Sequence, residues 1–300
     1  MTYRALTIAA ILLLIGAGCA GTAAPANQNA NGLDTSAPSG TTSDTSDHGD
    51  TEHLAVAAGS RIALDGKNNL KPDSVDLSFK LYGLDGHAFG PNDLTLAHEK
   101  KMHLLLVRDD MQGFQHVHPD YKKEKWTVSV NVPEAGHYQM YVDIDPEEEE
   151  PTVLRVPLTI GGPTAKKNPP VPNAAMSADD GAYRVALDVA RALKSGDETR
   201  LTFVVTENGK PAANIDPYLG AYGHVVLLRH GDVDDFFHVH PVTETKPADG
   251  RVQFDAVFPV TGRYTLYAQF NVKGTVRTFP ITVDVHDKGD AGAKDSGVHH

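Results

Sequence analysis

Cysteine and long apolar segments are scarce in this chain, and basic residues are outnumbered by acidic ones. The single Cys excludes an intrachain disulfide framework, a Cys-rich zinc site and an iron–sulfur cluster. The 27 Lys and Arg stand against 39 Asp and Glu and leave a formal net charge of −12. Nucleic-acid binding needs clustered positive charge to neutralise phosphates, so we expect no nucleic acid among the partners. Apolar residues still make up 40% of the 300 residues, which is enough to build packed cores.

The longest apolar run covers residues 5–18 and follows Arg4. Its length of about 14 residues is short for a bilayer core of about 30 Å but matches the apolar part of an export signal. Small residues stand directly before Cys19 and resemble a bacterial lipobox, in which the Cys is lipidated, although Gly16 stands where Leu is usual. The sequence therefore predicts a signal peptide over residues 1–18 and an extracytoplasmic lipoprotein, anchored through Cys19 to the cell membrane or outer membrane. An ordinary cleaved signal is the alternative.

Two parts of the chain repeat one pattern. Residues 102–108, MHLLLVR, match residues 223–229, GHVVLLR, and FQHVHP at residues 114–119 matches FFHVHP at residues 236–241. Two copies at domain-sized spacing indicate a tandem duplication and not a solenoid. Pro-rich residues 163–180 separate the copies and are predicted to form a hinge.

Alternating apolar residues run through both copies, as in Val75, Leu77 and Phe79 of the first and Leu201 and Phe203 of the second. A period of two predicts strands with one buried face. Strand-sized runs between Gly, Pro and Asp indicate an all-β sandwich of about seven strands per copy. The predicted organisation is a flexible linker over residues 19–58, a first β-sandwich module over 59–162, the hinge over 163–180, a second module over 181–286 and a disordered tail over 287–300.

Each copy contains a predicted hairpin that brings histidines together. In the first copy the turn at residues 109–112 joins two strands, and symmetric pairing about this turn places His103 opposite His118. His116 lies two residues along on the same face, within reach of both. The second copy predicts the same arrangement for His224, His238 and His240.

Three imidazoles at the end of one hairpin are what a histidine-based metal site needs. Neutral imidazole is a good ligand of zinc and copper, and three of them can occupy one side of an ion. We therefore predict one transition-metal ion, copper or zinc, in each module. The alternative is structural, because an H-x-H motif at a strand end can bond backbone carbonyls without any metal. The predicted ligands are His103, His116 and His118 in the first module and His224, His238 and His240 in the second.

Other side chains around the predicted sites would complete them. Phe114 and Phe236 share the face of the histidines and would provide an apolar wall. A thioether at Met102 would favour Cu(I), and His98 also stands near His103 in the sequence. The candidates for a fourth ligand or an outer hydrogen-bond partner are Tyr141 and Asp143 in the first module and Tyr267 and Gln269 in the second.

The two histidine blocks resemble those of a family of little-characterised bacterial secreted proteins and lipoproteins. The first block runs from Met102-His103 through Phe114-x-His116-x-His118-Pro119. The second runs from YLGAYGH at residues 218–224 through Phe236-x-His238-x-His240-Pro241, and the resemblance covers about residues 70–285. It implies exported, Ig-like or cupredoxin-like β-modules, often suspected of handling copper or other heavy metals, without an established reaction.

The leading hypothesis is a lipid-anchored extracytoplasmic binding protein, not an enzyme, that holds a transition metal and meets a partner protein outside the cytoplasm. The chain has no G-x-S-x-G motif, no Cys nucleophile and no paired acid–base motif, which argues against hydrolysis. Three-His sites with an open position can still hydrolyse or oxidise. The alternative from another class is a metal-free Ig-like scaffold or adhesion protein in which the histidines are structural.

Lipidation of Cys19 predicts that labelled palmitate enters the protein and that Cys19→Ser prevents this. Because the lipid would hold the protein on the membrane, the Cys19→Ser variant should move to the soluble fraction of the periplasm or to the medium. The measurement is membrane fractionation of both proteins, with palmitate incorporation beside it. Equal membrane partitioning of the two proteins would overturn the predicted anchor.

Overall fold

The computed structural model describes residues 54–56, 60–66, 70–163, 166–231 and 236–289, without the side chains of residues 54–56, His238 and His240. The predicted signal peptide, Cys19 and the greater part of the predicted linker and tail lie outside these residues. Within the described ranges no helix is both long and apolar enough to cross a membrane. All of these ranges belong to one unit, Gly49–His300.

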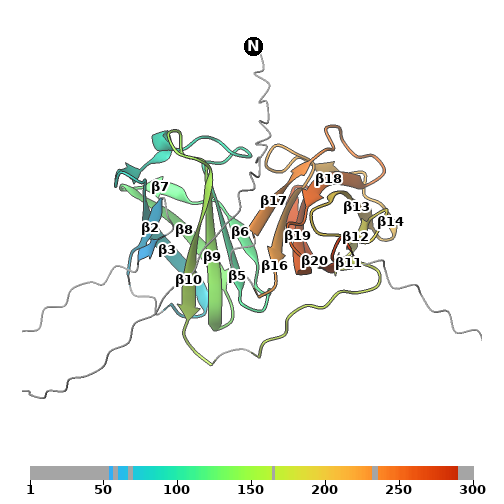
Figure 1. The fold of residues 1–300 in the computed structure, drawn as a ribbon, viewed down its shortest axis with the longest axis horizontal. Helices are drawn as coiled ribbons and strands as arrows, with labels where there is room; N and C mark the ends of the chain where they lie inside the picture. Colours follow the sequence, from blue (N-terminus) through green and yellow to red (C-terminus); the bar gives the residue numbers. More distant parts are fainter. Residues whose placement is uncertain (1–53, 57–59, 67–69, 164–165, 232–235, 290–300) are drawn as a thin grey trace, which may run out of the picture. The chain divides into compact units, whose positions relative to one another are not determined.

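The first module folds into two antiparallel sheets (Figure 1). Its elements are β1 (Leu54–Val56), β2 (Arg61–Leu64), β3 (Asp73–Tyr82), β4 (Ala88–Phe89), the 3-10 turn η1 (Pro91–Asp93), β5 (Met102–Arg108), β6 (Gln115–Val117), β7 (Asp120–Lys122), β8 (Lys125–Val132), β9 (Gly136–Ile144) and β10 (Thr152–Ile160). The six-stranded sheet has the order β1-β2-β3-β8-β7, with β4 paired to β3. The four-stranded sheet has the order β10-β9-β5-β6, so β5 is a central strand.

The second module places its strands in one continuous hydrogen-bonded path (Figure 1). Its strands are β11 (Ser177–Asp180), β12 (Tyr183–Asp188), β13 (Glu198–Glu207), β14 (Lys210–Pro211), β15 (Ile215–Asp216), β16 (His224–Arg229), β17 (Phe236–Pro241), β18 (Arg251–Val257), β19 (Gly262–Val272) and β20 (Thr275–Val285). The path runs β11-β12-β13-β18-β17-β16-β19-β15, with β14 on β13 and β20 on β19. Strand β17 pairs with β16 up to Val239 and with β18 from His240, so it connects the two halves of the module.

The apolar alternation of the sequence forms a core in each module. Val75, Leu77 and Phe79 on β3 are buried in one cluster with side chains of the four-stranded sheet. Leu201 and Phe203 on β13 belong to the corresponding cluster of the second module. The predicted all-β fold with two tandem β-sandwich modules is therefore confirmed.

A tyrosine fixes the same corner in both modules. The Tyr138 hydroxyl donates to the Glu134 carbonyl at 2.9 Å, and the Tyr264 hydroxyl donates to the Val260 carbonyl at 2.9 Å. Such a bond, from a buried Tyr near the start of a strand to backbone a few residues upstream, is typical of Greek-key sandwiches. The repeated bond shows that the duplicated sequence carries duplicated local structure.

The central strands β5 and β16 bury both of their faces. On β5, Leu106 joins the core of the first module, whereas Leu105 lies on the opposite face. On β16, Leu227 joins the core of the second module, whereas Leu228 lies on the opposite face. These opposite faces meet in a third apolar cluster, whose buried members are Leu105, Val107, Tyr141, Val226, Leu228, Phe236 and Tyr267.

The third cluster joins the two modules and was not predicted from the sequence. Alternation assigns one face of each strand to the core and leaves the other to solvent. The unbroken apolar run in residues 104–107, repeated in residues 225–228, is instead typical of strands buried on both faces. That run is therefore the feature of the sequence that could have predicted that the second face of each strand is also covered.

The segment between the modules is hydrogen-bonded to the turn that follows β5. The Asn168 N–H donates to Asp110 Oδ2 at 2.9 Å, and Gln112 Nε2 donates to the Asn168 carbonyl at 3.1 Å. Burial raises the pKa of the Asp110 carboxyl, but hydrogen bonds from Arg108 and from the Asn168 backbone outweigh it and lower the pKa below its ordinary value. Asp110 therefore remains charged and ties part of the predicted hinge to the first module.

Removing the corner hydrogen bonds should destabilise the protein slightly but measurably. Tyr138→Phe and Tyr264→Phe should each lower the free energy of unfolding by about 0.5–1.5 kcal/mol, because the hydrogen bond to the Glu134 or Val260 carbonyl is lost. Tyr82→Phe is the matched control, since the Tyr82 hydroxyl makes no hydrogen bond among the described residues. Urea titration measures all three, and an equal loss in Tyr82→Phe would contradict the role of the corner.

Candidate metal centre

His103 and His116 face each other across one hairpin of the first module. Met102 packs into the core, so its neighbour His103 points to the other face of β5, where it is 1% exposed. The hairpin pairs Leu104 with Val117 and Leu105 with His116, which is the predicted register. Strand β6 ends at Val117, and the His118 ring follows with its centroid 5.0 Å from that of His103.

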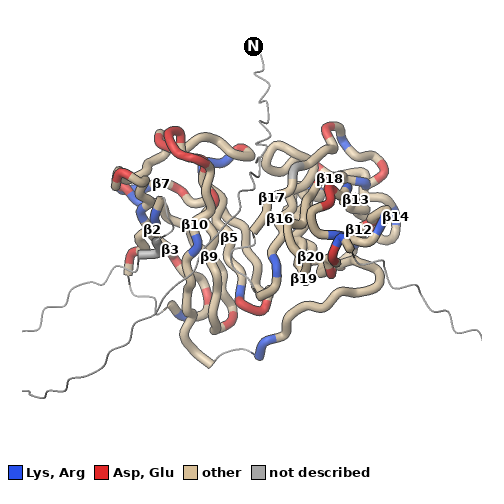
Figure 2. Tube along the Cα trace, viewed as in Figure 1, with Lys and Arg blue, Asp and Glu red and all other residues tan. Residues whose placement is uncertain are grey.

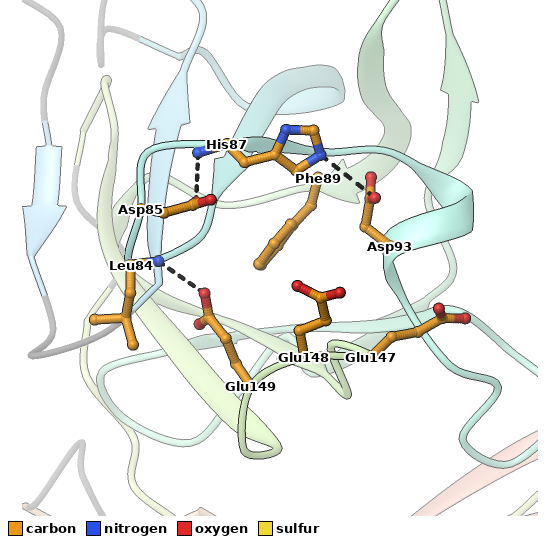
Figure 3. Close-up of a pocket in the computed structure, with 8 residues that line it drawn as sticks. All are labelled: Leu84, Asp85, His87, Phe89, Asp93, Glu147, Glu148 and Glu149. Carbon is orange, nitrogen blue, oxygen red and sulfur yellow. Dashed lines mark hydrogen bonds and ion pairs between the residues drawn. The ribbon is translucent and has the colours of Figure 1, made fainter.

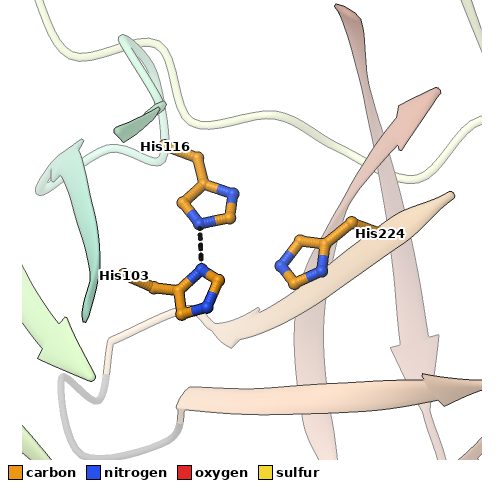
Figure 4. Close-up of side chains that lie close together, drawn as sticks. All are labelled: His103, His116 and His224. Atoms are coloured by element: carbon orange, nitrogen blue, oxygen red, sulfur yellow. Dashed lines mark hydrogen bonds between the residues drawn. The ribbon is translucent and has the colours of Figure 1, made fainter. Parts of the chain in front are cut away.

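Hydrogen bonds hold both imidazoles in place (Figure 4). His103 Nδ1 lies 3.0 Å from His116 Nε2. On the outer side, His103 Nε2 lies 2.9 Å from the Ala97 carbonyl oxygen. His116 Nδ1 lies 2.7 Å from Gln269 Oε1, an oxygen of the second module. Each ring therefore has one nitrogen bound to an oxygen and one nitrogen directed at the other ring.

These contacts fix the positions of the ring protons. The Ala97 carbonyl can only accept, so His103 Nε2 carries its proton. With the Gln269 amide nitrogen donating to Thr278 Oγ1 at 3.1 Å, Gln269 Oε1 accepts and His116 Nδ1 carries a proton as well. In two neutral rings the inner nitrogens then carry lone pairs that face each other. A metal ion bound between them would meet two ring nitrogens already directed at its position.

His224 adds a third imidazole from the second module (Figure 4). It is the first residue of β16, is 5% exposed, and follows Gly223, where a Cβ would lie 2.6 Å from Phe270 Cε1. Its ring centroid lies 4.8 Å from that of His116 and 5.9 Å from that of His103. One nitrogen from each ring can be chosen so that all three lie within 4.8 Å of one another. Tetrahedral zinc needs nitrogens about 3.4 Å apart, so small side-chain movements would complete the site.

His118 borders this group and keeps a neutral ring. Its Nε2 is buried without a hydrogen-bond partner in the described part of the chain. Burial, with a smaller effect from the charges of His103 and Lys100, lowers the pKa of His118 to about 4. The ring therefore offers a neutral nitrogen at pH 7, which is the form that binds metal.

A strained turn supports the site from one side. Ala97 and Lys100 exchange backbone hydrogen bonds of 2.9 and 3.0 Å, and the two residues between them, His98 and Glu99, have φ angles of +46° and +64°. Such turns usually contain Asn-Gly, because other residues adopt positive φ at a cost of about 1–3 kcal/mol each. This turn supplies the carbonyl that binds His103, and it places the His98 ring 5.9 Å from the ring of His103.

The two modules contact each other through equivalent residues. Phe114 stacks on Tyr267 with centroids 3.9 Å apart, and Phe236 stacks on Tyr141 with centroids 5.3 Å apart. The Tyr267 hydroxyl also donates to the Met111 carbonyl at 2.8 Å. Phe114 corresponds to Phe236 in the repeat and Tyr141 to Tyr267, so the contact is reciprocal, as in a two-fold interface.

The structure groups the predicted ligands differently from the expected one ion per module. It brings His103, His116 and His224 together, and His118 adjoins them. The side chains of His238 and His240 lie outside the described residues, although pairing of Val226 with His238 gives the predicted register of the second hairpin.

The other predicted neighbours take separate roles. Gln269 is paired with His224 across the strands but hydrogen-bonds His116 of the other module. Asp143 is paired with His103. Met102 faces the core and away from the site. Phe114, Phe236, Tyr141 and Tyr267 form the aromatic contacts between the modules.

A pocket lies at the acidic loop between β9 and β10 (Figure 3). Figure 2 colours the acidic residues of this loop red. The pocket, of about 310 Å³, is lined by His87, Asp93 and residues 147–149, among others. Glu149 accepts hydrogen bonds from Ser60 Oγ at 2.7 Å and from the Leu84 N–H at 2.8 Å, and His87 Nε2 lies 3.3 Å from Asp93. These groups hold neighbouring loops together, which accounts for their position without a ligand.

Comparison with known proteins places both modules in one family. The family described as "Domain of unknown function (DUF8832)" matches residues 55–160 and 176–287. A search of curated proteins gave no match.

Solved structures resemble the chain only weakly. A trypsin-activated alpha-2-macroglobulin from Escherichia coli is 11% identical over 76% of this chain and 16% of its own, with a TM-score of 0.26. The Bacteroides ovatus protein SGBP-B, in complex with a mixed-linkage heptasaccharide, is 16% identical over 72% of this chain and 42% of its own, with a TM-score of 0.20. Domains 4–9 of the surface layer protein SbsC are 15% identical over 79% of this chain and 32% of their own, with a TM-score of 0.22. The chain thus spans a small part of the first of these proteins, and none of them indicates a function for it.

Acid should destabilise the metal-free protein through His118. Its pKa is about 4 in the folded protein and about 6.5 in the unfolded chain, so the unfolded chain binds more protons between these pH values. The free energy of unfolding should therefore fall as the pH drops from about 6.5 to about 4, and His118→Leu should make this dependence shallower. Urea titrations across this pH range, with a chelator present, measure the slope. An unchanged slope in His118→Leu would contradict the lowered pKa of the His118 ring.

Proposed function

Since the chain belongs to the family of the domain of unknown function DUF8832, which it carries twice, we propose its function from its own residues. The protein is an extracytoplasmic, lipid-anchored binding protein that holds a transition-metal ion, copper or zinc, between its two modules. The ion is bound by His103, His116 and His224, with His118 beside them. Cys19 provides the lipid anchor.

One observation carries this proposal. The outer nitrogens of His103 and His116 are bound to the oxygens of Ala97 and Gln269, while the inner nitrogens face each other beside His224. Metal-binding histidines almost always donate their second N–H to an oxygen in this way, which fixes the tautomer and the direction of the ring. The hydrogen bonds thus prepare the rings for an ion.

The ligand set supports copper or zinc over magnesium or calcium. All three grouped ligands are imidazoles, which suit zinc and copper, whereas magnesium and calcium take oxygen ligands. His118 is a further candidate ligand because its nitrogen is neutral and buried. His238 is another, because it stands opposite Val226 in the register position that His116 holds opposite Leu105. His240 remains a candidate from the sequence alone.

The burial of the site supports binding over catalysis. His103 and His224 are 1% and 5% exposed, which leaves little room for a substrate beside an ion. A protein that carries or senses a metal needs no open coordination position, whereas a catalytic site keeps one. We therefore propose a non-enzymatic role, with an extracytoplasmic protein as the partner that delivers or receives the metal.

A metal-free scaffold is the second candidate function. The hydrogen bonds of His103 to Ala97 and of His116 to Gln269 are also what structural histidines make. In that case the imidazoles would serve only to hold the turn at residues 97–100 and the two modules in place.

Zinc or copper should stabilise the protein, and His224→Ala should abolish the effect. At a ligand concentration about a hundredfold above Kd, binding adds about 2.7 kcal/mol to the free energy of unfolding. Differential scanning calorimetry would show the gain as a higher melting temperature, and elemental analysis should find one ion per chain. His137→Ala, an exposed histidine on β9, is the matched control and should keep the full gain.

Two outcomes would contradict the proposal in different ways. A first-module site made of His103, His116 and His118 would keep its ion in His224→Ala, which would reject the site between the modules. A scaffold would gain no stability from zinc or copper in any variant, and the histidine substitutions would destabilise the metal-free protein.

A further inference from the structure

We infer that metal binding and the docking of the two modules are thermodynamically coupled, so that a bound ion stabilises the docked arrangement. This inference rests on the proposed function and adds how the same site is regulated. Three independent contacts between the modules lead to it.

The first contact is the ligand set itself. His103 and His116 belong to β5 and β6, whereas His224 belongs to β16 of the other module. An ion that binds all three rings is therefore bound only while the modules are docked. Separation of the modules would leave it with the ligands of the first module alone.

The second contact is the orientation of His116 by the other module. Gln269 on β19 accepts from His116 Nδ1 at 2.7 Å and so directs His116 Nε2 inward. Close by, a Cβ at Gly220 would lie 3.6 Å from Glu99 Cγ, so the turn that holds His103 touches the turn before His224. Undocking would remove the amide from His116 and the neighbouring turn from Glu99. Loss of such an outer partner typically weakens metal binding by about 10–100-fold.

The third contact is the apolar cluster on the same strand faces. Side chains two residues apart on a strand share a face, so His103 lies in line with Leu105 on β5, and His224 with Val226 and Leu228 on β16. The face that binds metal is thus continuous with the face that docks the modules. Anything that loosens the apolar contact displaces the ligands at its end.

Coupling of this kind is reciprocal. If docking strengthens metal binding by a given factor, metal binding strengthens docking by the same factor. The metal-loaded and metal-free proteins would then differ in the stability of the contact between the modules. A partner protein could distinguish the two states by this difference.

Two neighbouring leucines on β16 provide a matched test in the full-length protein. Leu228 is 1% exposed and lies in the cluster between the modules, whereas Leu227 is 0% exposed and lies in the core of the second module. Both Leu→Ala changes remove the same atoms from a buried site. Leu228→Ala should weaken zinc binding by about 5-fold or more, and Leu227→Ala should leave the Kd within about 2-fold of wild type. Isothermal titration with zinc measures both, after circular dichroism shows that each variant is folded.

A second measurement covers the case in which Leu228→Ala does not fold. Leu228→Val makes a smaller change at the same position. Hydrogen exchange of the backbone amides in β5 and β16 can be followed in the wild-type protein and in this variant, with and without zinc. Zinc should slow exchange in both strands, more in wild type than in Leu228→Val. Equal zinc affinity in the Leu228 and Leu227 variants, with no change in exchange, would reject the coupling while leaving the site. Absence of zinc or copper binding in the wild type would reject the proposed function itself.

Discussion

The need to cover both faces of β5 and β16 governs how this protein is built. Each strand carries apolar side chains on two sides, and its own module can cover only one of them. Leaving residues such as Leu105 and Leu228 in water would lose roughly 1.5–3 kcal/mol for each side chain. The modules avoid this loss by covering each other, which creates a third apolar cluster and fixes which residues meet at its edge. The histidines stand at that edge because His103 and His224 lie at the starts of β5 and β16, and His116 is paired with β5.

Buried polar groups need hydrogen-bond partners, and this requirement determines how the histidine rings are oriented. His103 and His116 are bound on their outer sides by Ala97 and Gln269, so only their inner nitrogens are left to interact with each other. The turn at His98 and Glu99 places the Ala97 carbonyl beside His103 Nε2, and its two residues adopt unfavourable positive φ angles to do so. Burial also keeps the pKa of His118 low, so its ring stays neutral. Each of these features favours metal binding. The H-x-H pattern, which predicted the ligands, did not predict any of them.

Local patterns allowed the strands, the duplication and the hairpin registers to be predicted, because alternation and turn symmetry act over a few residues. The pairing of Leu105 with His116 followed from counting about the turn at residues 109–112, and the structure agrees. The relation between the modules did not follow, because a period of two says which side chains share a face but not what covers that face. Gln269 shows the limit clearly. It was placed near its own module's histidines through strand neighbours, yet its side chain binds His116, 153 positions away in the sequence.

The hydrogen bonds that tie Asn168 to Asp110 and Gln112 have a consequence for how the site assembles. They shorten the free length of chain that separates the halves of the site, so the second half is always present at high local concentration, of millimolar order for short tethers. Two separate subunits with the same reciprocal surface would part on dilution. The two halves of a single chain stay at the same local concentration at any dilution, so His103, His116 and His224 remain together.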